Sequence, residues 1–355
     1  MRDEIDLSGQ PLTQRLDLLP VAGVARRLIL DRARLERVPD EVALLRGLEE
    51  LYLDGNQLTL LSPAISALPR LCRLSLFDNH LVTVSEDLAR LGDLRDLSLG
   101  RNRLRDFPVA VLQLTALRRL NLAENEIAVI PPEIAALTQL RMLDLGHNRI
   151  RELPVAMGAL SALEDALYLS DNLLERVPEP VFQGMPQLRY LSLTHNPLAT
   201  LPDSLGALTA LEELRLYANG LRALPDTIGA LANLRELHVQ DNRLEALPES
   251  LGSLTRLREL VASDNQLTQL PPAVTRLRAL ARLDLRNNPL KELPEEIGML
   301  RNLTFLDLRA THLTTLPDSM ERLTRLEKVD LRWTKLRTLP RWLDALHARG
   351  VRILL

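Results

Sequence analysis

The chain has 355 residues, 46% of them hydrophobic but only 3% aromatic, and its 44 basic and 47 acidic side chains give a formal net charge of −3. The core therefore has to be aliphatic, and a general electrostatic grip on nucleic acid, which needs a basic excess or stripe, is not expected. The single cysteine, Cys72, excludes an internal disulfide and favours a reducing compartment.

The N-terminal segment MRDEIDLSGQPL is acidic and has no apolar stretch of the kind found in secretory signals. No run of the sequence approaches the roughly 18 apolar residues that a membrane-spanning helix needs. These features predict a cytoplasmic protein without a membrane span. Export by a signal other than the Sec type is the alternative.

An eleven-residue pattern, LxxLxLxxNxL, recurs along the whole chain. The step is 23 residues, with one exception of 25 residues between Leu163 and Leu188. One extra residue before Leu167 and another near Phe182 account for that exception. The fifteen units begin at Arg2, Ala25, Leu48, Leu71, Leu94, Leu117, Leu140, Leu163, Leu188, Leu211, Leu234, Leu257, Leu280, Leu303 and Leu326. A sixteenth strand is predicted at Val351–Leu355.

The LxL part of each unit predicts a short parallel strand whose two leucines point to one face, because side chains alternate along a strand. An asparagine closes the strand in 11 of the 15 units, where a buried amide satisfies backbone groups at the turn. The second half of the unit, as in LRALPDTIGALANL (221–234), predicts one or two turns of α or 3₁₀ helix with proline at the first helical position. Ser62 and Ser85 replace this proline in two units.

These units predict a single solenoid over residues 1–355. Residues 1–24 form an N-terminal capping unit, in which LTQRLDLLPVAG (12–23) is expected to be helical, and 25–340 are the regular repeats. Residues 341–355 form a C-terminal cap, with a helix that buries Trp342, Leu343 and Leu346, a stop at Gly350 and a last strand.

The form LxxLPxxIGxLxxLxxLxLxxN resembles the 23-residue class of intracellular leucine-rich-repeat proteins. Ras-pathway scaffolds, plant Ras-group repeat proteins, Roco proteins and many bacterial proteins carry this class. The resemblance implies an α/β solenoid shaped like a horseshoe, with a parallel β-sheet on the concave side and short α or 3₁₀ segments on the convex side. It also implies binding of proteins, without identifying a partner.

Because leucine, asparagine and proline maintain the fold, binding specificity is expected at the outward third, fifth, seventh and eighth positions of each unit. Seven of the ten aromatic residues fall there, and aromatic side chains are enriched at binding hot spots. The general preference of strands for aromatic residues is the alternative explanation. The predicted partner-binding residues are Tyr52 and Phe77, then a central patch of Tyr168, Tyr190, His195, Arg215, Tyr217 and His238, and finally Phe305, Arg309, Arg332 and Trp333.

The last three regular units align three aspartates beside three arginines: Asp284, Asp307 and Asp330 beside Arg286, Arg309 and Arg332. Two interpretations are open. The columns neutralise each other as a surface ladder, or they recognise a partner of complementary charge.

The sequence lacks the motifs GxxxxGK[ST], GxGxxG, GxSxG and HExxH, so no catalysis is expected. His147, His195 and His238 lie two or more units apart, so neither a metal site nor a cofactor is predicted. We expect a non-catalytic scaffold that binds a protein on its concave face. The alternatives are a secreted bacterial effector that binds a host protein and a regulatory fragment of a larger enzyme. A monomer is expected, with end-to-end self-association as its alternative.

Overall fold

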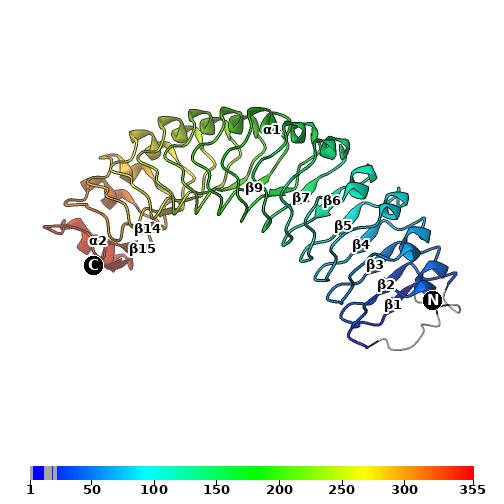
Figure 1. The fold of residues 1–355 in the computed structure, drawn as a ribbon. Helices are drawn as coiled ribbons and strands as arrows, with labels where there is room; N and C mark the ends of the chain where they lie inside the picture. The colour runs from blue at the N-terminus through cyan, green and yellow to red at the C-terminus, as the bar shows by residue number, and fades with distance from the viewer. Residues whose placement is uncertain (1–2, 12–17, 19–21) are drawn as a thin grey trace. The chain divides into compact units, whose positions relative to one another are not determined.

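The computed structural model describes residues 3–11, 18 and 22–355. The chain forms two compact units, Met1–Leu173 and Leu174–Leu355, and the division falls within the one irregular step of the repeat. In each unit, short strands line one side and short helices line the other (Figure 1). The predicted N-terminal helical segment at residues 12–23 falls almost entirely outside the described residues.

The first unit is a parallel sheet in which each strand pairs with the next along the chain. Its strands are β1 (Glu4–Asp6), β2 (Arg27–Ile29), β3 (Glu50–Tyr52), β4 (Arg73–Ser75), β5 (Asp96–Ser98), β6 (Arg119–Asn121), β7 (Met142–Asp144) and β8 (Ala166–Tyr168). The 3₁₀ helices are η2 (Asp40–Leu44), η3 (Pro63–Ala67), η4 (Glu86–Arg90), η5 (Val109–Gln113), η6 (Pro132–Ala136) and η7 (Val155–Ala159). Leu143 pairs with Leu167, so the extra residue lies before β8, as the sequence predicts.

The second unit repeats this arrangement. Its strands are β9 (Tyr190–Ser192), β10 (Glu213–Arg215), β11 (Glu236–His238), β12 (Glu259–Val261), β13 (Arg282–Asp284), β14 (Phe305–Asp307), β15 (Lys328–Asp330) and β16 (Arg352–Leu354). Its helices are α1 (Glu179–Gln183), η8 (Asp203–Ala207), η9 (Asp226–Ala230), η10 (Glu249–Ser253), η11 (Pro272–Arg276), η12 (Ile297–Met299), η13 (Asp318–Arg322) and α2 (Trp342–Ala348). The predicted leucine-rich-repeat solenoid, with parallel strands and short helical segments, is thus confirmed.

The leucines of each strand face the helices and form the core. In β10, Leu214 and the following Leu216 are fully buried, whereas the side chain of Arg215 between them is 39% exposed. Alternation of side chains along the strand produces this contrast. We call the side of each sheet that carries residues such as Arg215 the strand face of that unit.

The buried asparagines connect neighbouring repeats. Asn102 Nδ2 donates to the carbonyl oxygens of Leu76, Leu99 and Gly100 at 2.9–3.1 Å, and its Oδ1 accepts from the N–H of Leu81 at 3.0 Å. These bonds satisfy backbone groups where the chain leaves the sheet, and the contacts to Leu76 and Leu81 reach back to the preceding repeat. The predicted role of the asparagine is confirmed.

The proline of the repeat lies one position earlier than predicted. In η9, Pro225 is the N-cap residue, and the helix begins at Asp226. Proline suits the N-cap, because the backbone there is extended and the helix needs no hydrogen bond from the N–H that proline lacks. Where serine stands instead, its side chain caps the helix: Ser62 Oγ accepts from the N–H of Ala64, and Ser85 Oγ accepts from that of Asp87.

The longer repeat unit and the C-terminal cap each contain an α-helix, α1 and α2. Phe182 in α1 is fully buried, which explains why this longer unit carries an aromatic residue in its core. At the C-terminal end, α2 buries Trp342, Leu343 and Leu346. Gly350 then adopts a positive φ of 88° before β16, a conformation that favours glycine.

Candidate functional site

The strand face of the second unit carries a cluster of tyrosine, arginine and acidic side chains. In the register of the sheet, Glu213 lies beside both Tyr190 and Glu236, and Arg215 lies beside His238. The Arg215 guanidinium lies over the Tyr190 ring at 5.6 Å and donates to Glu213 Oε1 at 2.5 Å. Burial alone would lower the pKa of Arg215, but the bond to Glu213 and the nearby charges outweigh it and raise that pKa. The arginine is therefore a fixed positive charge beside an aromatic ring.

His195 and Tyr217 form an aromatic pair at the edge of the same face. Their rings meet edge to face, with centroids 5.3 Å apart and planes at 86°. His195 stands in the turn after β9, with a positive φ of 53°, and is exposed. The structure thus brings together five of the six residues of the predicted central patch: Tyr190, His195, Arg215, Tyr217 and His238. The sixth, Tyr168, is half-buried on β8 in the first unit.

Tyr52 in the first unit is surrounded by charged partners. Its hydroxyl donates to Glu50 Oε2 at 2.9 Å and accepts from Arg73 at 3.2 Å, and the Arg27 guanidinium lies 4.9 Å from its ring centroid. Phe77 is half-buried in the next repeat. The sequence pattern predicted the aromatic residues but not these arginines. The signal for them was an arginine at the third position of the units before and after that of Tyr52.

The C-terminal charge columns are paired internally. Arg309 binds both carboxylate oxygens of Asp307 and reaches Asp330 at 3.6 Å, while Arg332 binds both oxygens of Asp330. Asp307 and Asp330 are 1% and 0% exposed. These contacts correspond to the self-neutralised ladder, the first of the two interpretations from the sequence.

Two aromatic residues accompany this ladder. Phe305 is covered by Arg282 at 4.3 Å and by Lys328 at 5.1 Å from its ring centroid. Trp333 is 72% exposed, with the Arg332 guanidinium 5.5 Å from its ring. Trp333 is therefore exposed, whereas the other predicted partner-binding aromatic residues are half-buried.

One group of side chains on the strand face could hold a metal ion. Glu213, Glu236 and His238 each offer a ligand atom, and these atoms lie within 4.8 Å of one another. The sequence predicted no metal site, because its three strand-face histidines lie two or more units apart and no dense set of carboxylates was expected around them. The partners are carboxylates at the third position of two neighbouring units.

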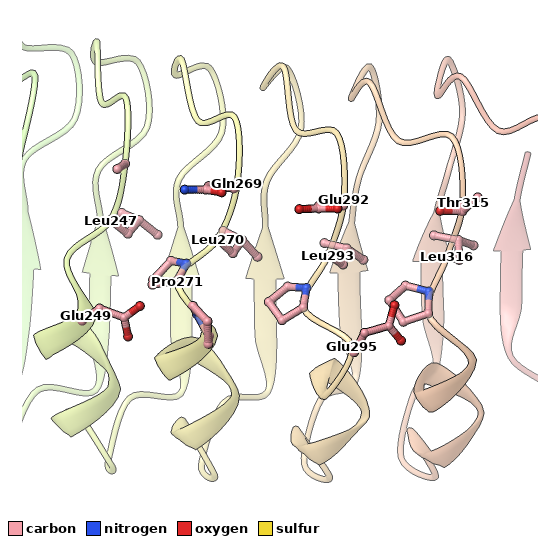
Figure 2. Close-up of a pocket in the computed structure, with 14 residues that line it drawn as sticks. Leu247, Glu249, Gln269, Leu270, Pro271, Glu292, Leu293, Glu295, Thr315 and Leu316 are labelled. Atoms are coloured by element: carbon pink, nitrogen blue, oxygen red, sulfur yellow. The ribbon is translucent and has the colours of Figure 1, made fainter.

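A second candidate surface lies where the chain passes from strand to helix in the second unit. A groove of about 420 Å³ crosses four repeats there, and Figure 2 shows residues that line it. Its floor is the row of nearly buried leucines Leu247, Leu270, Leu293 and Leu316, and exposed Glu249, Glu292 and Glu295 line its sides. The leucines of this floor are residues that the fold itself requires. Stacking of the repeats alone therefore explains the groove, without a binding role.

The repeated strands and helices, with a strand face whose residues vary from unit to unit, are those of a leucine-rich-repeat protein. Comparison with models of protein families gives the same class. The model described as leucine rich repeat matches residues 25–81, 69–127, 92–150, 115–172 and 278–336, and the model described as leucine-rich repeat region matches residues 180–283. The chain belongs to the leucine-rich-repeat proteins. Such domains are typically non-catalytic and generally bind proteins.

Solved structures are similar over most of the chain. A leucine-rich-repeat protein of Leptospira interrogans is 31% identical with a TM-score of 0.92, over 99% of this chain and 89% of that one. An internalin of Listeria monocytogenes is 25% identical with a TM-score of 0.70, over 81% of each chain. The plant peptide hormone receptor RGFR1, solved with RGF2, is 23% identical with a TM-score of 0.79, over 93% of this chain and 55% of that one, and it shows the fold alone. No curated protein matches the chain.

Within the described residues, no helix has the length and apolar character to cross a lipid bilayer.

Proposed function

We propose that this protein is a non-catalytic cytoplasmic scaffold, of the 23-residue repeat class, that binds a protein partner on its strand face. The observation that carries the proposal is the cluster on the second unit, where Tyr190, Arg215, Tyr217 and His195 lie together on one accessible face. Tyrosine and arginine dominate binding hot spots, because they bury a large area and lose little conformational freedom.

The contacts within the cluster support this role. The Tyr190 ring lies under Arg215, and the Tyr217 ring is held edge to face by His195. Side chains that are already positioned lose less entropy when a partner binds. The acidic and basic groups of the cluster, such as Glu213 and Arg215, also pair with each other. This pairing favours a partner that contributes apolar and hydrogen-bonding groups over one of high charge.

Affinity capture from native lysate of the source organism, with three forms of the full chain, tests the proposal. The forms are the wild type, Tyr190→Ala with Tyr217→Ala, and Glu249→Ala with Glu295→Ala as the matched control on the groove of Figure 2. We expect a specific partner to be retained by the wild type and by the glutamate variant, and to be lost with the tyrosine variant. Thermal unfolding of all three forms checks that they fold.

Two outcomes would count against the strand face. If the tyrosine variant captures the partner at full strength, the cluster is not the binding surface. If the glutamate variant alone loses the partner, binding occurs in the groove.

A further inference from the structure

We propose that Glu213, Glu236 and His238 form a zinc site on the strand face of the second unit. Each residue offers one ligand atom, and the three atoms lie within 4.8 Å of one another. Small rotations of these surface side chains would bring the atoms to the spacing that a bound ion requires, with ligand distances of about 2.0–2.2 Å.

The backbone positions the three donors. Parallel pairing places Glu213 of β10 directly beside Glu236 of β11. Alternation along β11 places Glu236 and His238 on the same face, and His238 Nε2 lies 3.3 Å from Glu236 Oε2. Among strands β1–β16 as the structure describes them, His238 is the only histidine within a strand. The combination is therefore not a property of the repeat itself.

The charges around the site favour a cation. The site contains two carboxylates, and Arg215 Nε binds Oε1 of one of them, Glu213, which leaves Oε2 of that carboxylate for an ion. A hydrogen bond of this kind to a liganding carboxylate fixes its orientation. The next carboxylate along the row, Glu259, is bound to Arg282 at 3.2 Å and stands outside the group.

The donor chemistry selects the ion. An imidazole nitrogen with two carboxylates suits zinc, whereas magnesium and calcium prefer oxygen ligands alone. Three protein ligands leave a coordination position for water, as in zinc sites that remain open.

Two residues beyond His238, the Oε1 atom of Gln240 is buried with no hydrogen-bond partner among the described residues. This part of the face thus carries an acceptor that the protein does not satisfy.

Calorimetric titration of the full chain with zinc chloride, with no partner present, tests the proposal. We expect one equivalent of zinc to bind, and His238→Ala and Glu236→Gln to weaken binding by at least about tenfold, since even the loss of a group that only orients a ligand costs that much. The controls are Glu259→Gln, one strand away, and His147→Ala, which removes a histidine lying 3.5 Å from Asp171 in the first unit. Both should bind zinc as the wild type does.

Cobalt(II) provides a second measurement. The wild type should develop visible absorption bands from bound cobalt, and His238→Ala should not. Absence of zinc binding by the folded wild type would overturn the proposal. So would full-strength binding by the folded His238→Ala variant, which would place the ion elsewhere. Neither result would affect the proposed protein partner, because no partner takes part in the titration.

Discussion

In the second unit, the turns that follow the interior strands and those that follow β14 and β15 make different side-chain hydrogen bonds over the same leucine core. In the interior, Asn242 bridges neighbouring repeats: its Nδ2 donates to the carbonyls of Leu216, Val239 and Gln240, and its Oδ1 accepts from the N–H of Leu221. At the end, Thr311 and Thr334 each donate one bond, to a carbonyl of their own repeat.

The last turns compensate with charge. Arg309 contacts Asp307 of its own repeat and Asp330 of the next one, so the ion pairs form the side-chain link that asparagine forms elsewhere. The leucines therefore define the stack, whereas the side-chain links between repeats can be either amide hydrogen bonds or ion pairs. Uncharged amide links should be insensitive to salt and pH, and the charged links should respond to both.

The largest effect is expected from Asn242→Ala. It leaves the buried N–H of Leu221 and several carbonyls without partners, and should lower the free energy of unfolding by about 3 kcal/mol.

Asn219→Ala is the matched control. Asn219 makes the same donor contacts, but its Oδ1 has no partner among the described residues, so its loss should be about 1–2 kcal/mol. Chemical denaturation measures both, and equal losses would contradict the role of the accepting oxygen.

Asp330→Asn should come next, with a loss of about 2 kcal/mol, because it weakens charge-assisted bonds to Arg332 and Arg309 in a fully buried position. Burial alone would raise the pKa of Asp330, but the arginine contacts outweigh it and lower that pKa below 3.8. The stabilisation is therefore present above pH 3.8 and is lost as the pH falls through the lowered value.

Denaturation at low and high salt measures this effect. Asp344→Asn, at an exposed position on α2, is the control and should change little. A loss for Asp330→Asn that is no larger than the control's would show that the charged ladder does not link the repeats.

A smaller effect is expected from Thr311→Val, which keeps the shape of the side chain and removes its bond to the carbonyl of Leu308. The free energy of unfolding should fall by about 1 kcal/mol. Thermal unfolding beside Asn242→Ala compares the two kinds of turn directly. If the threonine variant loses as much as the asparagine variant, the two turns do not differ in the way described.

Asp284→Asn should have a similarly small effect of the opposite sign. Burial and the neighbouring charge of Asp307 raise the pKa of Asp284, so its ionised form opposes folding above pH 3.8. The amide keeps an acceptor for the N–H of Arg286 and should raise stability at neutral pH by about 1 kcal/mol. Asn121 already makes the equivalent bond, to the N–H of Ala123. Unfolding midpoints across pH measure the gain. A loss at neutral pH would contradict this explanation.

The sequence predicts the repeat well because its periodic leucines leave one arrangement that buries them. It also places Tyr190, Arg215 and Tyr217 on the accessible face, since alternation along a strand requires it. It does not predict which side chains meet across strands. The contact of Arg27 with Tyr52 and the convergence of Glu213 on His238 depend on side-chain rotamers, which the spacing of the repeat does not contain. The division into two units falls within the irregular step between Leu163 and Leu188, but the spacing alone did not predict a division there.

Hydroxyl-radical footprinting of the full chain, alone and with the captured partner, tests the central claim most directly. Oxidation of Tyr190 and Tyr217 should fall in the complex, while that of Met299, which is 36% exposed on η12, should not change. Protection of Met299 with both tyrosines still fully oxidised would contradict binding on the strand face.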